Sequence, residues 1–511
     1  MTIINSIVSI VNYNRLAEID SFRRNPHIVQ YNVLKNLINY AQDTEFGRLH
    51  GFDKIKSYDD FIKNVPVRSY EEIKPFIQKS FEGQQNVLWT GETKWFAKSS
   101  GTTSDKSKFI PITKESLEEC HFRSGKDIFI MYADKFPESS IFLGKSLAIG
   151  GSTSINTLNE NSYFGDLSAV IIKNLPLWTY LNRIPPAEIA LIQDWETKLN
   201  KIVEISHNKN VTNIIGVPSW LLVLLKRLLE YTKKSNILEV WPNLELFVHG
   251  GVSFVPYRKT FETLIPSKSM TYLETYNASE GFFAIQDEFS QSTDGIDKGM
   301  LLMLDYGIFF EFIELSDYLN NNYFAVPLEQ VKPNINYVLV ISTNGGLWRY
   351  VIGDTVSFTS TNPYRIKITG RTKHYINAFG EEIIIDNVQT ALAYASSMTN
   401  AEIKEYTAAP IFYEKGSQGA HQYLIEFLTP PNDLELFRFS LDKKIKELNS
   451  DYEAKRTNDI TLGPPDIIIA KTNTFYKWLQ QKGKLGGQNK IPRLSNTREY
   501  IDELLKINSE L

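Results

Sequence analysis

The hydrophobic positions of the first 90 residues recur at a spacing of three and four. The run from Ile28 to Ala41 is the clearest case, with apolar residues on one face and polar residues between them. This spacing is typical of amphipathic helices that bury one side. We therefore expect the chain to be mostly helical up to about residue 90, and we expect a further helix over residues 114–133.

A different pattern follows, in which short apolar runs alternate with helical sequence. Ser146–Gly150 and Asn213–Val217 are runs of this kind and predict buried strands. Pro218 opens the helix predicted over Trp220–Tyr231, because proline suits the first helical turn. Leu244–Val255 predicts a strand, a glycine turn and a second strand. Strands that alternate with helices indicate a layered α/β architecture.

The second half of the chain predicts first a β-rich part and then a small mixed part. Residues 300–315 and 335–359 alternate with β-branched and aromatic residues, as in an antiparallel sheet or a small barrel. Beyond about residue 375 we expect a strand over 382–385, a helix over 388–395, a strand over 422–427 and a helix over 434–448. The predicted fold class is α/β, with a large layered α/β domain and its antiparallel β subdomain at residues 1–372. A small mobile α+β domain is expected at residues 373–511.

Composition narrows the classes of protein. At 511 residues the chain exceeds the size of one hydrophobic core, and its net charge of -4 argues against binding nucleic acid through phosphate neutralisation. No segment approaches the roughly 20 apolar residues of a membrane span, and the first ten residues predict a docked amphipathic helix instead of a signal peptide. The only cysteine, Cys120, cannot form an intrachain disulfide and is expected to be a packing residue. These features predict a cytoplasmic protein without membrane or nucleic-acid partners.

The stretch Phe96–Pro111 carries the first candidate chemistry, because it is rich in hydroxyls, contains a glycine and has lysines nearby. Such a loop suits a polyphosphate, and the plain alternative is a solvated polar turn. Gly101 lets the backbone turn its amides toward an anion. The predicted donors are the hydroxyls of Ser99, Ser100, Thr102 and Thr103, with positive charge from Lys106 and Lys108.

Several familiar sites are disfavoured. The chain contains neither G-x-x-x-x-G-K-[ST] nor G-x-G-x-x-G, so a Walker-type loop or a dinucleotide-binding fold is not expected. The seven histidines are scattered, which disfavours a zinc site built from histidine. Ser279 lies in Asn277–Gly281, which resembles a nucleophile elbow but lacks its first glycine, so a hydrolase is a weak alternative.

Further clusters follow the hydroxyl-rich loop in a fixed order. They are His249–Ser253, Tyr272–Gly281 with the sequence Tyr-Asn-Ala-Ser-Glu-Gly at its end, Trp348–Thr355, Gly370–Glu382, and a lysine-rich tail at Gly483–Leu494. In this order they resemble the adenylate-forming superfamily of acyl-CoA synthetases, peptide-synthetase adenylation domains and luciferases. The chain is more closely similar to the auxin-responsive acyl acid–amido synthetase family of plants, which has bacterial members. The resemblance runs from about residue 90 to the C-terminus.

The resemblance implies an ATP site, since forming an acyl-adenylate needs positioning and cationic stabilisation of two anions that repel each other. It implies that Ser99–Thr103 hold the β- and γ-phosphates, and that Gly250 and Gly251 let the adenine lie against backbone. Tyr276 would stack on the adenine, with Ala278 and Ser279 in the same nucleotide-binding set.

The resemblance also implies the charged residues of the site. Glu280 would hold Mg²⁺, and Asp354 would accept both ribose hydroxyls. Arg371 would contact ribose or phosphate oxygens, and Lys490 would reach the α-phosphate and the carboxylate. Lys484 is an alternative to Lys490 as the tail lysine. The predicted catalytic set is therefore Lys490, Arg371 and Glu280.

Each assignment has a plainer alternative, and the chain departs from the superfamily pattern in places. Glu280 and Asp354 could be surface carboxylates or helix caps, and the glycine pair could be only a turn. The loop has Ser104–Asp105 in place of a second glycine, and Lys373 stands where the hinge usually has an aspartate. Arg123 could neutralise the acyl carboxylate or be a surface arginine.

The predicted function is that of an ATP- and Mg²⁺-dependent ligase that adenylates a carboxylic acid and transfers the acyl group to an amine. The amine is expected to be an amino acid, and the lid motion of the small domain would separate the two half-reactions. One alternative ends on the thiol of coenzyme A or a carrier protein. Another is a non-catalytic nucleotide-binding protein that has kept the fold.

Overall fold

The computed structural model describes the chain apart from residues 1–12, 100–107, 151–154, 160–161, 177–181, 193, 252–253, 255–256, 289–297, 373–374, 382, 413–417, 457–461 and 483–491. The chain divides into two compact units. Unit 1 consists of residues 1–99, 108–254 and 259–372, and unit 2 of residues 100–107, 255–258 and 373–511. The docked helix predicted for the first ten residues lies outside the described residues.

The N-terminal part of unit 1 is helical, as its hydrophobic spacing predicts. Capping residues explain where several helices start: Pro26 stands at the first position of α3, and Ser57 and Ser69 form capping boxes with the acids three residues on. The helices are α2 (Tyr13–Arg24), α3 (Pro26–Ala41), α4 (Glu45–Leu49), η1 (Phe52–Lys54), α5 (Tyr58–Asn64) and α6 (Tyr70–Phe81).

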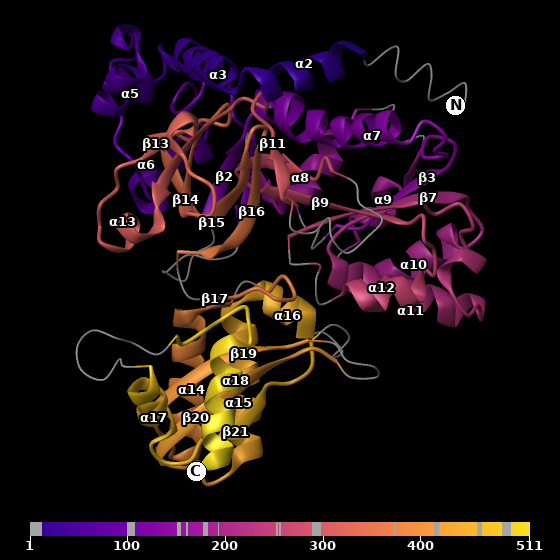
Figure 1. Ribbon diagram of the computed structural model, residues 1–511, viewed down its shortest axis with the longest axis vertical. Coiled ribbons are helices and arrows are strands. Elements are labelled where there is room, and N and C mark those ends of the chain that lie inside the picture. The colour runs from indigo at the N-terminus through magenta and orange to yellow at the C-terminus, as the bar shows by residue number, and fades with distance from the viewer. Residues whose placement is uncertain are drawn as a thin grey trace. The chain divides into compact units, whose positions relative to one another are not determined.

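A sheet of twelve strands forms the centre of unit 1 (Figure 1). Its strands are all antiparallel at one end and all parallel at the other. The order is β13 (Val326–Pro327), β12 (Ile308–Glu314), β14 (Asn336–Thr343), β15 (Tyr350–Thr361), β16 (Tyr364–Arg371), β11 (Met300–Leu302), β10 (Gly281–Ile285), β9 (Thr271–Ala278), β8 (Leu246–Gly250), β7 (Val211–Ile215), β3 (Lys145–Ala148) and β6 (Arg183–Ile184).

The remaining elements of unit 1 cover this sheet or form a second one. The smaller sheet has the order β2 (Lys108–Ile112), β1 (Trp95–Ser99), β5 (Ser162–Gly165) and β4 (Asn156–Asn159). The helices are η2 (Ser116–Phe122), α7 (Arg123–Lys135), α8 (Leu167–Asn174), α9 (Ala187–Ala190), α10 (Trp195–Ser206), α11 (Pro218–Thr232), η4 (Ile237–Glu239), α12 (Arg258–Leu264), α13 (Leu315–Leu319) and η6 (Leu328–Gln330).

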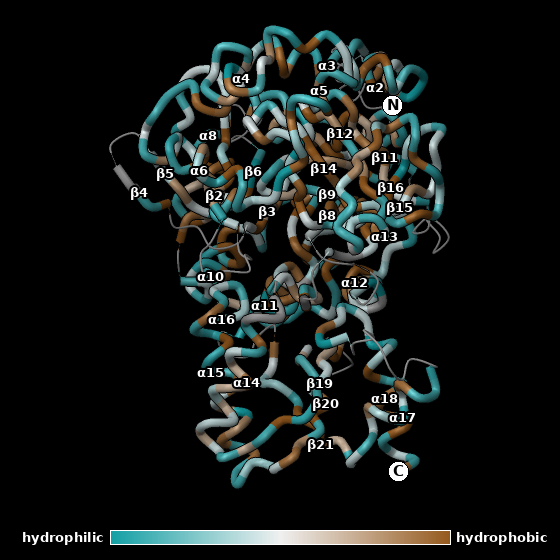
Figure 2. Tube along the Cα trace, turned by 90° about the vertical axis from the view of Figure 1, so that its left-hand side faces the viewer, coloured by the Kyte–Doolittle hydropathy of each residue, from teal (hydrophilic) through white to brown (hydrophobic). Residues whose placement is uncertain are grey.

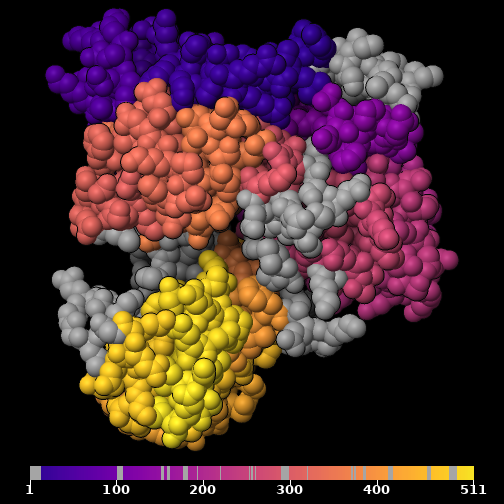
Figure 3. All heavy atoms as spheres, viewed as in Figure 1, coloured from indigo at the N-terminus to yellow at the C-terminus, as the bar shows by residue number. Residues whose placement is uncertain are grey.

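The N-terminal helices pack on the antiparallel half of the large sheet. Gln30 of α3 is buried and donates to the carbonyl oxygens of Leu304 and Ile308 at 2.8 and 2.9 Å. In the space-filling view the N-terminal helices form a layer directly over these strands (Figure 3). The hydrophobic colouring gathers on the strands around β12 and β14, where the apolar core of unit 1 lies (Figure 2).

Unit 2 is a small α+β domain. Its three-stranded sheet has the order β19 (Glu402–Ile411), β20 (Ala420–Thr429) and β21 (Asp466–Ile469), and a short pair is formed by β17 (Tyr375–Ile376) and β18 (Ile383–Ile384). The helices are α14 (Ile385–Thr399), α15 (Leu434–Leu448), α16 (Ser450–Arg456), α17 (Thr474–Gln481) and α18 (Glu499–Glu510).

The predicted fold class is confirmed, with two differences in detail. The antiparallel strands are continuous with the parallel ones through β16, β11, β10 and β9, so they form no separate sheet or barrel. The second strand predicted after Gly251 is wrong where the structure describes it, because Phe254 lies in a bend. Strand β8 has two parallel neighbours, and a parallel partner is reached by a crossover instead of a tight hairpin.

Candidate nucleotide site

The parallel strands β8 and β9 bring the first predicted site residues to one edge of the large sheet. Gly250 pairs with Thr275 across the β8–β9 ladder, and the carboxyl ends of the two strands meet at the same edge. A Cβ at Gly250 would lie 2.5 Å from the Thr275 carbonyl oxygen, so only glycine fits there. Gly251 has φ +82°, which glycine adopts without strain. The glycine pair is therefore more than a turn, since Gly250 permits a close approach of two strands.

Strand β9 ends in a tight hairpin that carries Ser279 and Glu280. Ala278 pairs with Gly281, so these two residues form the connection to the antiparallel strand β10. A nucleophile elbow leads from a strand into a helix, whereas here a strand follows. The hydrolase alternative is therefore wrong. Glu280 is half-buried in this strand connection and caps no helix.

Asp354 lies beside β9 through a hydrogen bond. The Tyr276 hydroxyl donates to Asp354 Oδ2 at 2.7 Å, and the two residues are only 4% and 6% exposed. Asp354 also pairs with Arg371 across the β15–β16 ladder. The surface-carboxylate alternative is therefore wrong for Asp354. The Tyr276 ring packs edge-on against Phe283 with centroids 4.8 Å apart, and its stacking on adenine stays a prediction.

The ends of the hydroxyl-rich loop meet at the same strand that carries Asp354. Ser99 and Lys108 pair across the β1–β2 hairpin. Lys108 Nζ donates to the Tyr350 hydroxyl at 3.1 Å and lies 5.5 Å from the centroid of the Tyr70 ring. Because Tyr350 begins β15, the two ends of the loop lie close to the segment that leads to Asp354.

Glu280 is electrostatically coupled to the same place. Burial raises the pKa of Tyr70, and the negative charges of Glu71 and Glu280 add to this rise. The Tyr70 hydroxyl in turn accepts from the Phe109 N–H at 2.8 Å, next to Lys108. A lysine and two phenols therefore lie together where β2 begins, and the charge of Glu280 acts on one of these phenols.

Other predicted residues lie outside the described part of the chain. These are Ser100, Gly101, Thr102, Thr103 and Lys106 of the loop, Lys373 near the hinge, and the tail lysines Lys484 and Lys490. Arg371 is described only as backbone. For the described ranges, no group of three or more His, Cys, Asp or Glu side chains is arranged to hold a metal ion.

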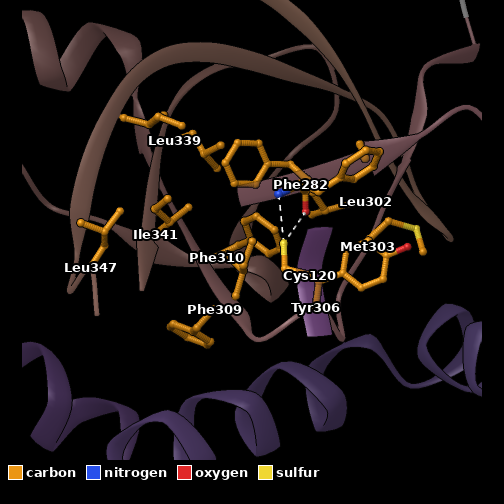
Figure 4. Close-up of a cluster of buried hydrophobic side chains, with 14 of the residues drawn as sticks. Cys120, Phe282, Leu302, Met303, Tyr306, Phe309, Phe310, Leu339, Ile341 and Leu347 are labelled. Carbon is orange, nitrogen blue, oxygen red and sulfur yellow. Dashed lines mark hydrogen bonds between the residues drawn. The ribbon is translucent and has the colours of Figure 1, made fainter. Parts of the chain in front are cut away.

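Cys120 is the packing residue that the sequence predicts. It is buried in the core of unit 1, and burial raises the pKa of its thiol to about 12. The Phe282 N–H donates to Cys120 Sγ at 3.1 Å, at an irregularity in the β9–β10 ladder (Figure 4). Cys120 thereby ties the π-helical turn η2 to the hairpin that carries Glu280.

Arg123 joins helices instead of standing free. Its guanidinium lies 2.5 Å from Glu18 of α2 and 3.7 Å from Asp305. This pairing leaves the proposed contact with an acyl carboxylate without support from the structure.

Sequence reasoning missed residues that only the folded chain brings to the site. Tyr70 and Tyr350 are examples, although Tyr350 lies within the recognised Trp348–Thr355 cluster. A cavity of about 400 Å³ in unit 1, lined by Tyr31, Tyr58 and Phe324 among others, contains none of the predicted site residues.

Solved structures share this fold. The GH3.15 acyl acid amido synthetase superposes with a TM-score of 0.61 at 19% identity, covering 97% of this chain and 95% of its own. A 2-hydroxyisobutyryl-CoA ligase superposes with a TM-score of 0.57 at 14% identity, covering 94% and 92%. The fold is that of the adenylate-forming ligases.

The family follows from the sequence itself. Residues 15–270 match the GH3 family N-terminal domain, residues 301–371 the central domain and residues 386–499 the C-terminal domain. The chain belongs to the GH3 family. Indole-3-acetic acid-amido synthetase GH3.4 of Arabidopsis thaliana is 22% identical over 93% of this chain and 90% of its own length. Jasmonoyl–L-amino acid synthetase JAR6 of Nicotiana attenuata is 23% identical over 94% and 92%.

These matches confirm the predicted family and the predicted class of enzyme, an acyl acid–amido synthetase. The described helices also include none that is both long and apolar enough to cross a bilayer.

Proposed function

We propose that this protein uses ATP to join a carboxylic acid to the amino group of an amino acid. In the first step a carboxylate oxygen attacks the α-phosphorus of ATP, which gives an acyl-AMP and pyrophosphate. In the second step the amine nitrogen attacks the acyl carbon and loses a proton, and AMP leaves as the amide forms. Relatives named as amido synthetases of indole-3-acetic acid and as a glutamate ligase of 4-substituted benzoates support this chemistry.

One observation carries the proposal. The Tyr276–Asp354 hydrogen bond joins the end of β9 to β15, and Tyr350 at the start of β15 is hydrogen-bonded to Lys108, where the hydroxyl-rich loop ends. Two features of these residues support a nucleotide at this place. Gly250 lets β8 and β9 approach closely at the edge of the sheet where the adenine is proposed to lie. A buried carboxylate at Asp354 suits a pair of ribose hydroxyls, because each hydroxyl can donate to one oxygen.

The charged groups of the site have separate proposed roles in binding the phosphates. Ser99–Thr103 and Lys108 are proposed to bind the β- and γ-phosphates, and Arg371 and Lys490 to stabilise charge that develops at the α-phosphate. Magnesium, when bound, neutralises phosphate charge, and it prefers oxygen ligands. Glu280 is the proposed protein ligand, and its position in the connection that follows β9, the strand of Tyr276, supports this role.

We further propose that residues 373–511 act as a lid that moves between the two half-reactions. The division of the chain into two compact units supports two separate bodies. A cytoplasmic location is also proposed, because a chain with one cysteine suits a reducing compartment.

The test is pyrophosphate exchange into ATP with a panel of carboxylic acids. We expect exchange only when a suitable acid is present, and loss of exchange in Asp354→Asn. Asp287→Asn is the matched control, because the Asp287 side chain is also buried but lies outside the proposed site, where it is paired with Arg365 at 2.8 Å. Exchange that needs no acid, or no exchange with any acid, would contradict the adenylation step.

Product analysis separates the acceptors. Mass spectrometry of reactions that contain both amino acids and coenzyme A should detect an amide. A thioester as the only product would favour the acyl-CoA alternative. ATP binding without any turnover would favour the non-catalytic alternative.

A further inference from the structure

A buried ion pair lies just before the strand segment that carries Asp354. Arg349 Nε is 2.9 Å from Glu311 Oε2, and one terminal nitrogen of the guanidinium is 2.8 Å from Oε1. Glu311 is 0% exposed and Arg349 5%. The contact is bidentate, which fixes the direction of the guanidinium as well as its position.

A tyrosine and a helix end complete the arrangement. The Tyr58 hydroxyl donates to Glu311 Oε1 at 2.8 Å, and the second terminal nitrogen of Arg349 donates to the Val65 carbonyl oxygen at 2.8 Å. Tyr58 is the first residue of α5, and Val65 directly follows that helix. We call Tyr58, Glu311 and Arg349 the clamp. It joins α5, β12 and the start of β15.

The backbone at Arg349 is held in an uncommon conformation. Its φ is +43°, a region that a residue with a Cβ enters only at a cost. The Arg349 N–H donates to Ser342 Oγ at 2.9 Å, and the Arg349 carbonyl accepts from the Arg68 N–H at 2.9 Å. Such strain persists only where the surroundings over-determine it.

The residues on either side of Arg349 are fixed in different directions. The Trp348 indole N–H donates to the Leu88 carbonyl at 3.1 Å in the core. The Tyr350 hydroxyl instead accepts a hydrogen bond from Lys108, the first residue after the hydroxyl-rich loop. The turn at Arg349 therefore separates two fully buried side chains, one held at Leu88 and the other at Lys108.

Beyond Tyr350 the strand contains a bulge. Val340 pairs with Val351 and Val338 with Thr355, so one residue of β14 stands opposite residues 352–354 of β15. Gly353 takes φ +95° within this bulge. A bulge re-aims the side chains around it, and its position depends on the register of the paired residues before it. The direction of Asp354 thus depends on how Tyr350 and Val351 are held on the β14 side, as well as on its pairing with Arg371 on the β16 side.

We propose that the Tyr58–Glu311–Arg349 clamp is a positioning device that fixes the register of β15, and thereby aims Asp354 at the nucleotide and holds Tyr350 against Lys108. Its effect on catalysis rests on the proposed function, whereas its effect on the strand does not. Burying an ion pair brings little net stability, because apolar residues of similar size often serve the fold as well. A purely structural pair could therefore be replaced by apolar residues without loss.

The decisive variant is the double substitution Glu311→Leu with Arg349→Met, which removes both charges and keeps the volume. We expect a melting temperature close to that of the wild type, since no unpaired charge remains. We expect the KM for ATP to rise by about tenfold or more, with a smaller change in kcat, because a misplacement of a binding group by 1 Å is costly. The KM for the acid should stay near its wild-type value.

Amide hydrogen exchange in the protein without ligands gives a readout that needs no activity. The Val351 N–H donates to the Arg68 carbonyl at 2.8 Å, and this bond depends on the register that the clamp holds. Peptides that cover residues 348–356 should exchange faster in the double variant. Tyr58→Phe should change the amide hydrogen exchange and the KM for ATP in the same direction by a smaller factor. Because it keeps the ion pair, this variant still tests the proposal if the double variant does not fold.

A second buried cluster with an arginine, a carboxylate and a tyrosine supplies the control, and its Arg15 is also paired with Asp305 and Glu18. Arg15 and Tyr306 both contact Asp127, at 2.6 and 2.7 Å, in another part of unit 1. Arg15→Met with Asp127→Leu should leave the KM for ATP and the exchange of residues 348–356 unchanged. The proposal would be overturned if both double variants changed the KM for ATP and the amide hydrogen exchange equally. It would also be overturned if the clamp variant kept the wild-type KM for ATP and the wild-type amide hydrogen exchange. If the wild type shows no acid-dependent pyrophosphate exchange, the proposed function fails. The amide hydrogen exchange of residues 348–356 then still decides whether the clamp holds the strand.

Discussion

Replacing Gly250 by alanine tests the closest approach in the candidate site. The new Cβ would lie 2.5 Å from the Thr275 carbonyl oxygen and 2.9 Å from Thr275 Oγ1. Ordinary contact begins near 3.4 Å, so β8 and β9 would have to separate by about 0.9 Å. Neither strand can give way easily, because β9 is also paired with β10 and β8 with β7.

The size of the effect follows from this geometry. Overpacking of this kind costs about 1–3 kcal/mol of folding free energy. The strain also reaches the site, since Thr275 precedes Tyr276, whose hydroxyl holds Asp354. A loss of about 1.4 kcal/mol in binding free energy corresponds to a tenfold larger dissociation constant for ATP. We therefore expect lower stability together with at least that loss of affinity.

The assay combines urea unfolding with calorimetric titration of a non-hydrolysable ATP analogue. Gly125→Ala is the matched control, because its Cβ would meet nothing within 4 Å in helix α7. Alanine should stabilise that helix by about 0.5–1 kcal/mol and leave nucleotide affinity unchanged. A Gly250→Ala protein that is as stable as the wild type and binds the analogue equally well would refute the reasoning.

Three further outcomes are expected. Burial raises the pKa of the Cys120 thiol to about 12, so N-ethylmaleimide should modify it only after denaturation, and rapid labelling of the native protein would contradict this. Cys120→Ala should lower the free energy of unfolding by about 1–3 kcal/mol, because the Phe282 N–H loses its acceptor. Burial holds the pKa of His121 at about 4, below its ordinary 6.5, so the unfolded chain binds more protons between these values and stability should fall as the pH drops from 6.5 to about 4. Urea unfolding across this range should give a shallower slope for His121→Leu, and an identical slope would contradict the expectation. Tyr276→Phe removes a hydrogen bond to a buried carboxylate and should lower the free energy of unfolding by about 1.5–3 kcal/mol, measured by urea unfolding, with no change as the opposing result.

Local patterns in the sequence predict much of the fold. The three- and four-residue spacing of Ile28–Ala41 corresponds to α3, and Pro218 stands at the first turn of α11. Strand β19 could not be predicted, because Glu402–Ile411 contains lysine, glutamate and adjacent alanines, which are poor strand formers. It forms a strand because its second half is buried against the rest of unit 2.

The site shows the same division between local and long-range information. Motif order points to Gly250, Tyr276 and Asp354, and the fold joins Tyr276 to Asp354 and sets Gly250 beside Thr275. The clamp leaves no local signal, because Glu311 and Arg349 are 38 positions apart and either charge alone predicts a surface residue. Only the fold pairs them. The π-helical turn at Ser116–Phe122 is likewise invisible in a pattern that simply predicts a helix.

A structure of the protein with a non-hydrolysable ATP analogue and Mg²⁺ tests the central claim most directly. We expect the adenine against Gly250 and Gly251, both ribose hydroxyls within hydrogen-bonding distance of Asp354, and the phosphates at the loop that begins at Ser99. An analogue bound elsewhere, with Asp354 still held only by protein groups such as Tyr276, would contradict it.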